Sequence, residues 1–176
     1  MSTPHVILIA AGSTIIGIAT VLLLIKPRIS YLRRRLFTDP TTGLLNYEGF
    51  LNYLKRYQKK ESFVLFLLDL DDFRRFNRQS YDTGDVVLKL FATRLSKKMN
   101  GIAICARYRL GDEFLLVAHE KDTEKVSSLL ANLNTEVSYK DDSVHFSSGI
   151  AAIECNDASC FNAIRTAHDI LMSKKI

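Results

Sequence analysis

Apolar and polar positions divide the chain into one long apolar run followed by shorter periodic segments. The run from Val6 to Ile25 holds no charged residue, and its only polar members are Ser13, Thr14 and Thr20. Twenty such residues in a helix rise about 30 Å, enough to cross the hydrocarbon core of a bilayer. A cleaved signal peptide is the alternative, but no cation precedes the run and five follow it. The pattern therefore predicts a transmembrane signal anchor over residues 1–26.

A basic stripe follows the apolar run and accounts for the whole excess of positive charge. Residues 26–35 contain no acid and five cations, which are Lys26, Arg28, Arg33, Arg34 and Arg35. Removing these five from the 24 basic residues leaves 19, equal to the 19 acidic residues. A neutral remainder does not favour nucleic-acid binding. Cations flank a span on its cytoplasmic side, so we expect a single-pass protein of the inner membrane whose C-terminal part lies in the cytoplasm.

The remaining apolar pattern predicts a connector and one domain. Pro27 is expected to break the helix after the span, so residues 27–36 are a juxtamembrane linker and the domain covers 37–176. Residues 63–68 are apolar without interruption, as in a strand buried on both faces. Strands are predicted over 62–70, 102–109, 113–119 and 144–153, and helices over 47–60, 72–77, 84–99, 121–133 and 159–175. This order indicates an α/β (α+β) fold, with a mixed, ferredoxin-like sheet flanked by helices.

Carboxylates collect at one end of the predicted sheet. Asp69 ends the buried strand, Asp71 follows it, and the turn between the next two strands carries Asp112 and Glu113. Strand ends often return acids to water, which is the simpler interpretation. If the hairpin pairs beside the Asp69 strand, the three carboxylates of Asp69, Asp112 and Glu113 instead converge, and oxygen ligands of this kind suit Mg²⁺ bound to substrate phosphates. The four histidines and three cysteines have no ligand spacing, so no zinc site is expected.

Six segments in order carry a resemblance to one family. Asp39–Asn46 resembles a DxLTGLxN motif, Asp69–Asn77 resembles DxDxFKxxN, and the hairpin of residues 109–114 resembles GGDEF with one glycine missing. Further matches are the GDxxL helix start at 84–88, an SxGxA strand at 147–151 and a closing helix at 167–175. The domain therefore resembles the GGDEF family, the diguanylate cyclases, in which two subunits each hold one GTP and join them into cyclic di-GMP.

The resemblance implies roles for the acids. Asp69, the carbonyl of Leu70 and Asp112 would hold Mg²⁺. Glu113 would help to deprotonate the attacking 3′-hydroxyl.

The resemblance also implies how the nucleotide is held. Asn77 and Asp85 would read the guanine edge, and Lys175 would contact the phosphates. As alternatives, Asn77 and Asp85 are ordinary helix caps and Lys175 is a solvated charge.

Several positions depart from the family pattern. Either Leu110 replaces the first glycine of the hairpin, or one glycine is deleted after it. A leucine at positive φ costs about 1 kcal/mol or more, and a deletion would displace Asp112 from Asp69. Ser80–Asp82 replaces the usual tyrosine-glycine-histidine, and the closing arginine is absent. Residues 100–103 lack the inhibitory RxxD motif, so product feedback there is not expected.

These departures favour a membrane-anchored, degenerate GGDEF domain that is catalytically inactive. It would act in cyclic di-GMP-related signalling by binding GTP or a protein, as a homodimer or with a heteromeric partner. A weakly active diguanylate cyclase is the alternative, because Asp69, Asp112, Glu113 and Lys175 remain. An unrelated anchored domain with the same topology is a third interpretation.

Overall fold

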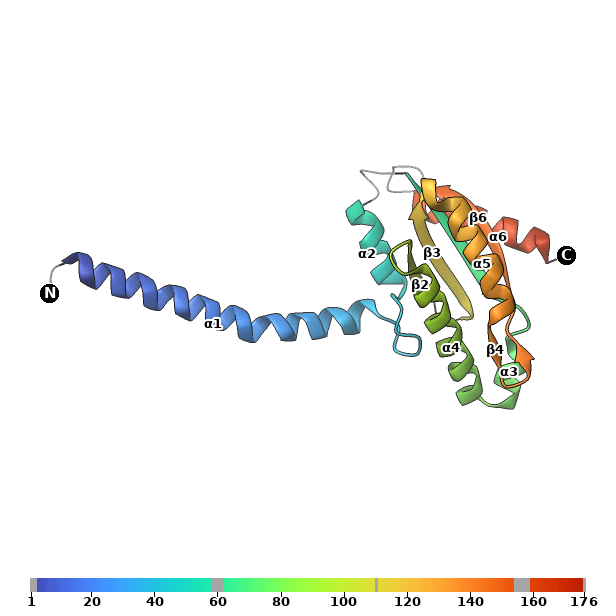
Figure 1. Cartoon of the computed structure of the whole chain (residues 1–176), viewed down its shortest axis with the longest axis horizontal. Helices are drawn as coiled ribbons and strands as arrows, with labels where there is room; N and C mark the ends of the chain where they lie inside the picture. The colour runs from blue at the N-terminus through green and yellow to red at the C-terminus, as the bar shows by residue number, and fades with distance from the viewer. Residues whose placement is uncertain (1–2, 58–61, 110, 154–158, 176) are drawn as a thin grey trace. The chain divides into compact units, whose positions relative to one another are not determined.

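The structure is a computed structural model that describes residues 3–57, 62–109, 111–153 and 159–175, with side chains from Ile16 onward except that of Ser159. The chain divides into two compact units, Met1–Leu36 and Phe37–Ile176. The first unit is nearly all one helix, α1 (Thr3–Phe37), of 35 residues (Figure 1).

Helix α1 passes through Pro27, so the predicted break at this proline is wrong. Proline removes one backbone hydrogen bond, but the leucines and arginines on both sides are good helix formers that carry the helix past it. Among the described residues, no helix combines the length and the apolar character needed to cross a membrane. Residues 6–15 of the predicted span lie outside the described side chains, and the anchor stays a prediction.

The second unit is built on a four-stranded sheet in the order β2-β3-β1-β6. Its strands are β1 (Phe63–Leu70), β2 (Ala103–Tyr108), β3 (Glu113–His119) and β6 (Phe146–Ile153). Every neighbouring pair is antiparallel, so the predicted mixed sheet is wrong, although the ferredoxin-like strand order holds. The helical crossover makes β1 and β2 run in the same direction, but β3 inserts between them and removes the parallel contact.

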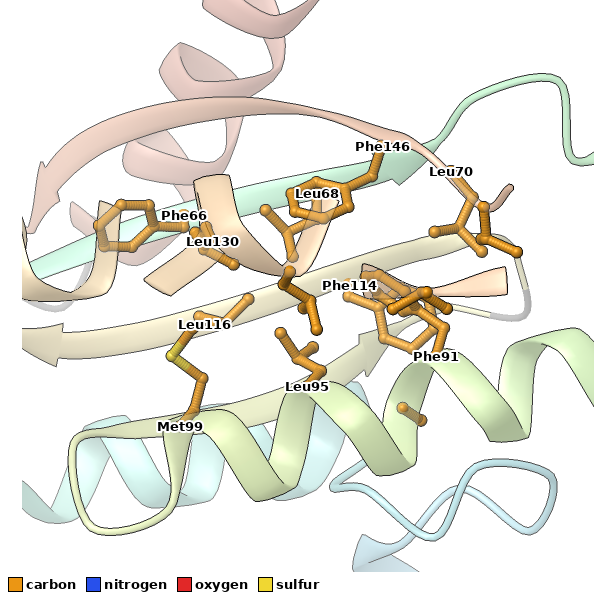
Figure 2. Close-up of a cluster of buried hydrophobic side chains, with 14 of the residues drawn as sticks. Phe66, Leu68, Leu70, Phe91, Leu95, Met99, Phe114, Leu116, Leu130 and Phe146 are labelled. Atoms are coloured by element: carbon orange, nitrogen blue, oxygen red, sulfur yellow. The ribbon is translucent and has the colours of Figure 1, made fainter. Parts of the chain in front are cut away.

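Helices cover both faces of the sheet (Figure 1). They are α2 (Tyr47–Tyr57), α3 (Arg74–Gln79), α4 (Tyr81–Met99), α5 (Thr123–Glu136) and α6 (Ser159–Lys174). One core joins Phe66 and Leu68 of β1 to Phe91 and Leu95 of α4, and also includes α5 (Figure 2). Burial on this face explains why the even-numbered residues of β1 are apolar.

The alternate residues of β1 pack on the opposite face. Leu65 and Leu67 contact a second core that contains Phe50 of α2 together with Ile164 and Leu171 of α6. Since both faces of β1 are buried, its sequence is continuously apolar rather than alternating. The odd-numbered face therefore belongs to α2 and α6, and Asp69 continues that face at the end of the strand.

Two short elements were not predicted. A two-stranded hairpin joins β4 (Ser138–Tyr139) to β5 (Asp142–Ser143), and a 3₁₀ turn covers Glu120–Asp122. Two-residue strands are too short for hydrophobic alternation to reveal them.

Candidate functional site

The acids at the sheet end come together through strand register. Asp69 lies opposite Glu113 of β3 on one side and opposite Ser147 of β6 on the other. The backbone N–H of Leu70 donates to the carbonyl of Asp112 over 3.2 Å, which continues the pairing into the turn. Opposed residues of an antiparallel pair have Cβ atoms about 5 Å apart on the same face. Asp69 and Glu113 therefore share the α6 face, with Asp112 next to them along the chain.

The proximity of these acids affects their protonation. Burial raises the pKa of Asp112, and the charge of Asp69 raises it further. The pKa of Glu113 is also raised, first by burial and then by Asp69, while His168 acts in the opposite direction. We call the end of the sheet that carries Asp69, Asp112 and Glu113 the acidic edge. Its carboxylates are stabilised either by binding protons or by a nearby cation.

Lys175, which follows α6, supplies a cation to this edge. Its ammonium binds Asp69 and lies 3.3 Å from Oδ1 of Asp71, which also accepts a 2.8 Å hydrogen bond from the Ser147 hydroxyl. Burial alone would lower the pKa of Lys175, but its bonds to Asp69 and Asp71 outweigh burial and raise it. Lys174 is held separately, by the Ser148 carbonyl at 2.9 Å. Lys175, which was predicted to contact the phosphates, thus binds Asp69, which was predicted to hold the metal.

The donor set fits Mg²⁺ in part. Carboxylate and carbonyl oxygens are the ligands that Mg²⁺ prefers, and Asp69, Leu70 and Asp112 supply them at one sheet end. In the described part of the chain, however, no three or more acids, histidines or cysteines are grouped so as to hold a metal ion. Because Asp69 is already paired with Lys175, a divalent cation would have to displace this ammonium.

Asn77 and Asp85 form a second group at the α3–α4 junction. The Oδ1 atom of Asn77 lies 2.0 Å from where a Cβ on Gly84 would be, so this glycine makes room for the Asn77 side chain. Asp85 follows it and is exposed. No hydrogen bond or ion pair connects this group to the acidic edge within the described residues. The structure therefore brings Asn77 close to the Asp85 segment, but does not join them to the acids.

Neither residue is a helix cap, so that alternative is wrong. Ser80 caps α4, because its hydroxyl accepts the N–H of Thr83 at 3.0 Å, and the same residue ends α3. Helix α4 consequently begins at Tyr81 rather than at Gly84, which places Asp85 inside the second turn.

Sequence reasoning missed the role of a buried ion pair beneath the hairpin. Nη1 of Arg107 lies 3.2 and 3.3 Å from the two carboxylate oxygens of Asp39, and both side chains are at least nine-tenths buried. Nε of Arg107 donates to the Gly111 carbonyl at 2.9 Å. Asp39 also accepts two hydrogen bonds from Thr42. Arg107 therefore ties the turn that carries the acids to the segment before α2. A lone arginine in an apolar strand was the available signal.

The described residues on either side of Leu110 give the conformation of part of the turn. Leu110 lies outside the described residues, so both alignments of this position stay predictions. Arg109 adopts the left-handed conformation, with φ of 54°, and its guanidinium lies 5.0 Å from the centre of the Tyr108 ring. Gly111 does not have positive φ, and a Cβ there would meet nothing closer than 3.9 Å. Among the described residues of the turn, Arg109 carries the conformational strain.

Because the pKa of Glu113 is raised, we predict that Glu113→Gln stabilises the domain, and that the gain in stability depends on pH. A folded pKa above the unfolded value gives stability that is fully present below the ordinary pKa of about 4.3 and lost as pH rises. At pH 7 the charged Glu113 therefore opposes folding, and glutamine removes that cost. We expect the variant to melt about 1–2 °C higher at pH 7 and to match the parent near pH 4.

Thermal melts at both pH values measure this effect. Glu136→Gln is the control, because Glu136 pairs with Lys98 and its loss should bring no gain at pH 7. A lower melting temperature for Glu113→Gln at pH 7 would contradict the electrostatic account of the edge.

The fold and the site together define a ferredoxin-like α+β domain with an acidic edge at the end of its central strand. The model of the family described as "Diguanylate cyclase, GGDEF domain" matches residues 36–176. The chain therefore belongs to the GGDEF family.

Solved structures share this fold. The coiled coil and GGDEF domain of DgcB from Caulobacter crescentus, solved with c-di-GMP, has a TM-score of 0.77 at 21% identity and covers 94% of each chain. Diguanylate cyclase SiaD from Pseudomonas aeruginosa, solved with its activator SiaC, has a TM-score of 0.77 at 23% identity over 97% of this chain and 70% of SiaD. The FimX GGDEF domain from the same organism has a TM-score of 0.65 at 18% identity, over 78% of this chain and 92% of that one. No curated protein matches the sequence.

Proposed function

We propose that this chain is an inner-membrane GGDEF protein that acts in cyclic di-GMP signalling without making cyclic di-GMP. It works by binding a protein partner or GTP through its cytoplasmic domain. Membership of the family supports the signalling context. The apolar run of residues 6–25 and the five cations after it support the anchor and its orientation.

The observation that carries this proposal is the ion cluster of Lys175 with Asp69 and Asp71. Joining two GTP molecules requires Asp69 to hold a cation next to the phosphates. Here an ammonium from the chain itself neutralises that carboxylate, and the lysine is withdrawn from the phosphates it would otherwise contact. Both losses affect the same step, so they lower the rate together. In the alignment where Leu110 replaces the first glycine of the motif, its side chain adds bulk where the family has glycine.

Nucleotide binding without turnover remains compatible with these residues. Asp69, the Leu70 carbonyl and Asp112 would hold Mg²⁺, whose chemistry is to neutralise phosphate charge and to polarise the reacting groups. Asn77 and Asp85 offer hydrogen-bonding groups to a guanine base from the α3–α4 junction. Lys175 must leave Asp69 for this to occur.

A weakly active diguanylate cyclase is the second candidate. Asp112 and Glu113 are both placed beside Asp69, and burial raises the pKa of Glu113, which makes this carboxylate a stronger base. This candidate requires Lys175 to exchange between the acids and the phosphates.

One assay separates the two candidates. The chain in detergent is incubated with GTP and Mg²⁺, and cyclic di-GMP is measured by chromatography, with GTP affinity measured in parallel by calorimetry. We expect no product. Product that disappears in Asp112→Ala would overturn the inactive interpretation and establish the cyclase.

Removing Lys175 should strengthen the binding of a divalent cation at the acidic edge. Lys175→Met frees the carboxylates of Asp69 and Asp71 from their ammonium, so we expect Mn²⁺ to bind about tenfold more tightly, or about 1.4 kcal/mol. Electron paramagnetic resonance of free Mn²⁺ measures this without nucleotide. Lys174→Met is the matched control, because this lysine donates to the Ser148 carbonyl and, within the described part of the chain, pairs with no acid. Equal affinity in both variants would show that Lys175 does not compete with the metal.

A further inference from the structure

A cavity lies between helix α6 and the hairpin that joins β2 to β3. One wall comes from Tyr108, Arg109 and Glu113 of the hairpin, and the other comes from four residues within 161–168 of α6. The volume of the cavity is about 240 Å³, far more than the roughly 30 Å³ that one water molecule occupies in the liquid. Ligand pockets usually have volumes of roughly 300–1,000 Å³, so a cavity slightly below this range suits a compact organic molecule.

This cavity is separate from the proposed nucleotide and metal positions. Of the site residues named above, all of which the structure describes, only Glu113 lines it. The residues that lie elsewhere are Asp69, Leu70, Asn77, Asp85, Asp112 and Lys175. A molecule in the cavity would therefore contact the acidic edge through Glu113 without occupying the positions proposed for Mg²⁺ or guanine.

The cavity wall carries more positive than negative charge. Arg109 and Arg165 supply two cations and Glu113 supplies one anion, so the wall has a net charge of +1 when His168 is neutral. In the described part of the chain, neither arginine lies within ion-pair distance of an acid. One negative charge on a ligand would balance this wall. A carboxylate carries one charge, whereas a phosphate monoester carries nearly two near neutral pH.

Arg109 is well placed to bind a carboxylate. Its guanidinium lies 5.0 Å from the centre of the Tyr108 ring. The Tyr108 ring is itself held by an edge-to-face contact with Tyr47, whose ring centre is 5.3 Å away. Stacking covers one face of the guanidinium but leaves its N–H groups free to point outward in the plane. This planar fork of donors matches the two oxygens of a carboxylate.

Helix α6 supplies an apolar surface beside these cations. Ile164 is buried, whereas Phe161 is 63% exposed. A single exposed phenylalanine is common on protein surfaces, but this one borders the same cavity as the two arginines. Aromatic rings pair favourably in offset or edge-to-face geometry, so the ring of a ligand would cover Phe161. His168 lines the cavity as well, and its imidazole can donate a hydrogen bond.

We propose that this cavity binds a small aromatic molecule with one carboxylate group. The carboxylate binds the guanidinium groups of Arg109 and Arg165, and the ring packs on Phe161. A nucleoside triphosphate is a poor occupant, because its several negative charges exceed the charge of the wall. The proposal goes beyond the proposed function and does not depend on whether the domain makes cyclic di-GMP or binds a protein.

Binding of three naphthalene compounds to the full chain tests the proposal. The chain is placed in nanodiscs of zwitterionic lipid, and naphthoate, naphthyl phosphate and naphthylmethylamine are titrated by calorimetry, with empty nanodiscs as the blank. We expect naphthoate to bind with a Kd below about 1 mM, and at least about tenfold more tightly than the other two compounds. Equal binding of the amine, or no saturable binding of naphthoate beyond the blank, would overturn the proposal. Tighter binding of the phosphate would overturn it in favour of a phosphate ester.

Two pairs of variants locate the bound molecule. Arg165→Gln should weaken naphthoate about tenfold, whereas Arg94→Gln should leave its affinity unchanged, because Arg94 is exposed on α4 and does not line the cavity. Phe161→Ala should also weaken binding, whereas Met172→Ala should not, because Met172 is exposed on α6 outside the cavity. All four side chains are exposed, so we expect each variant to fold, and circular dichroism checks this. Equal losses in the two arginine variants would show that binding reflects charge alone and would overturn the proposal.

The aromatic part of the ligand is tested with a pair of simpler acids. Benzoate should bind about threefold more tightly than cyclohexanecarboxylate, because only benzoate has a ring that stacks on Phe161. Phe161→Ala should remove this difference. Equal affinities of the two acids for the parent chain would contradict the assignment of an aromatic ligand.

Discussion

Replacing Arg107 with methionine should lower the free energy of unfolding by about 3–5 kcal/mol, because it leaves the buried Asp39 carboxylate without its cationic partner. Methionine keeps the volume of the side chain but loses the ion pair and the hydrogen bond to the Gly111 carbonyl. Urea unfolding of the chain, followed by near-ultraviolet circular dichroism of its tyrosines, measures this loss.

Two controls identify the cause of that loss. Adding Asp39→Asn to the variant should recover much of the stability, because the uncompensated buried charge disappears while Thr42 keeps an oxygen to bind. Lys98→Met breaks the ion pair with the half-exposed Glu136, and should cost at most about 1 kcal/mol. A double variant no more stable than Arg107→Met would assign the loss to packing or to the Gly111 contact instead.

Gly149→Ala should destabilise the domain by about 3 kcal/mol or more, because the α6 backbone packs directly against β6 at this residue. A Cβ at Gly149 would lie 1.8 Å from the Ala167 carbonyl oxygen and 3.1 Å from the Leu171 nitrogen, both of which are backbone atoms of α6. Backbone atoms cannot rotate away as a side chain does, so α6 must move. This movement would also disturb Lys175, which follows α6 and binds Asp69.

Thermal melting of Gly149→Ala beside Gly111→Ala measures this effect. Gly111→Ala is the matched control, since its Cβ would meet nothing closer than 3.9 Å and Gly111 does not have positive φ. We expect the control to melt within about 2 °C of the parent. If Gly149→Ala behaves in the same way, the close packing of α6 on β6 is not as tight as described.

The positions of the acids show how stability and function are linked here. Glu113 and Phe114 are consecutive residues of a strand, so their side chains point to opposite faces. The centre of the Phe114 ring lies 4.9 Å from that of the Phe91 ring in the core (Figure 2). This contact turns Glu113 toward Asp69 and α6. Arg107 holds the other end of the same turn. The acidic edge is therefore supported by the hydrophobic core and by a buried ion pair.

The sequence predicted most elements of the domain because their signals are local. Strand β3 has the predicted bounds, and β1 begins one residue later than expected, since apolar periodicity reports burial directly. The α4 start was placed three residues late, because the Ser80 cap was not recognised. The acids were chosen from the sequence alone, because carboxylates end the continuously apolar strand and also occupy the turn of the next hairpin.

Only the tertiary structure decided which of these residues meet. Strand order removed the expected parallel pair and placed Glu113 opposite Asp69, and the position of α6 carried Lys175 onto the acids rather than leaving it free for phosphates. These contacts join residues far apart in the chain. The sequence determined the kinds of residue and the elements, because periodicity and propensity act over a few residues. Packing determined the pairings, because they depend on where distant elements come to lie.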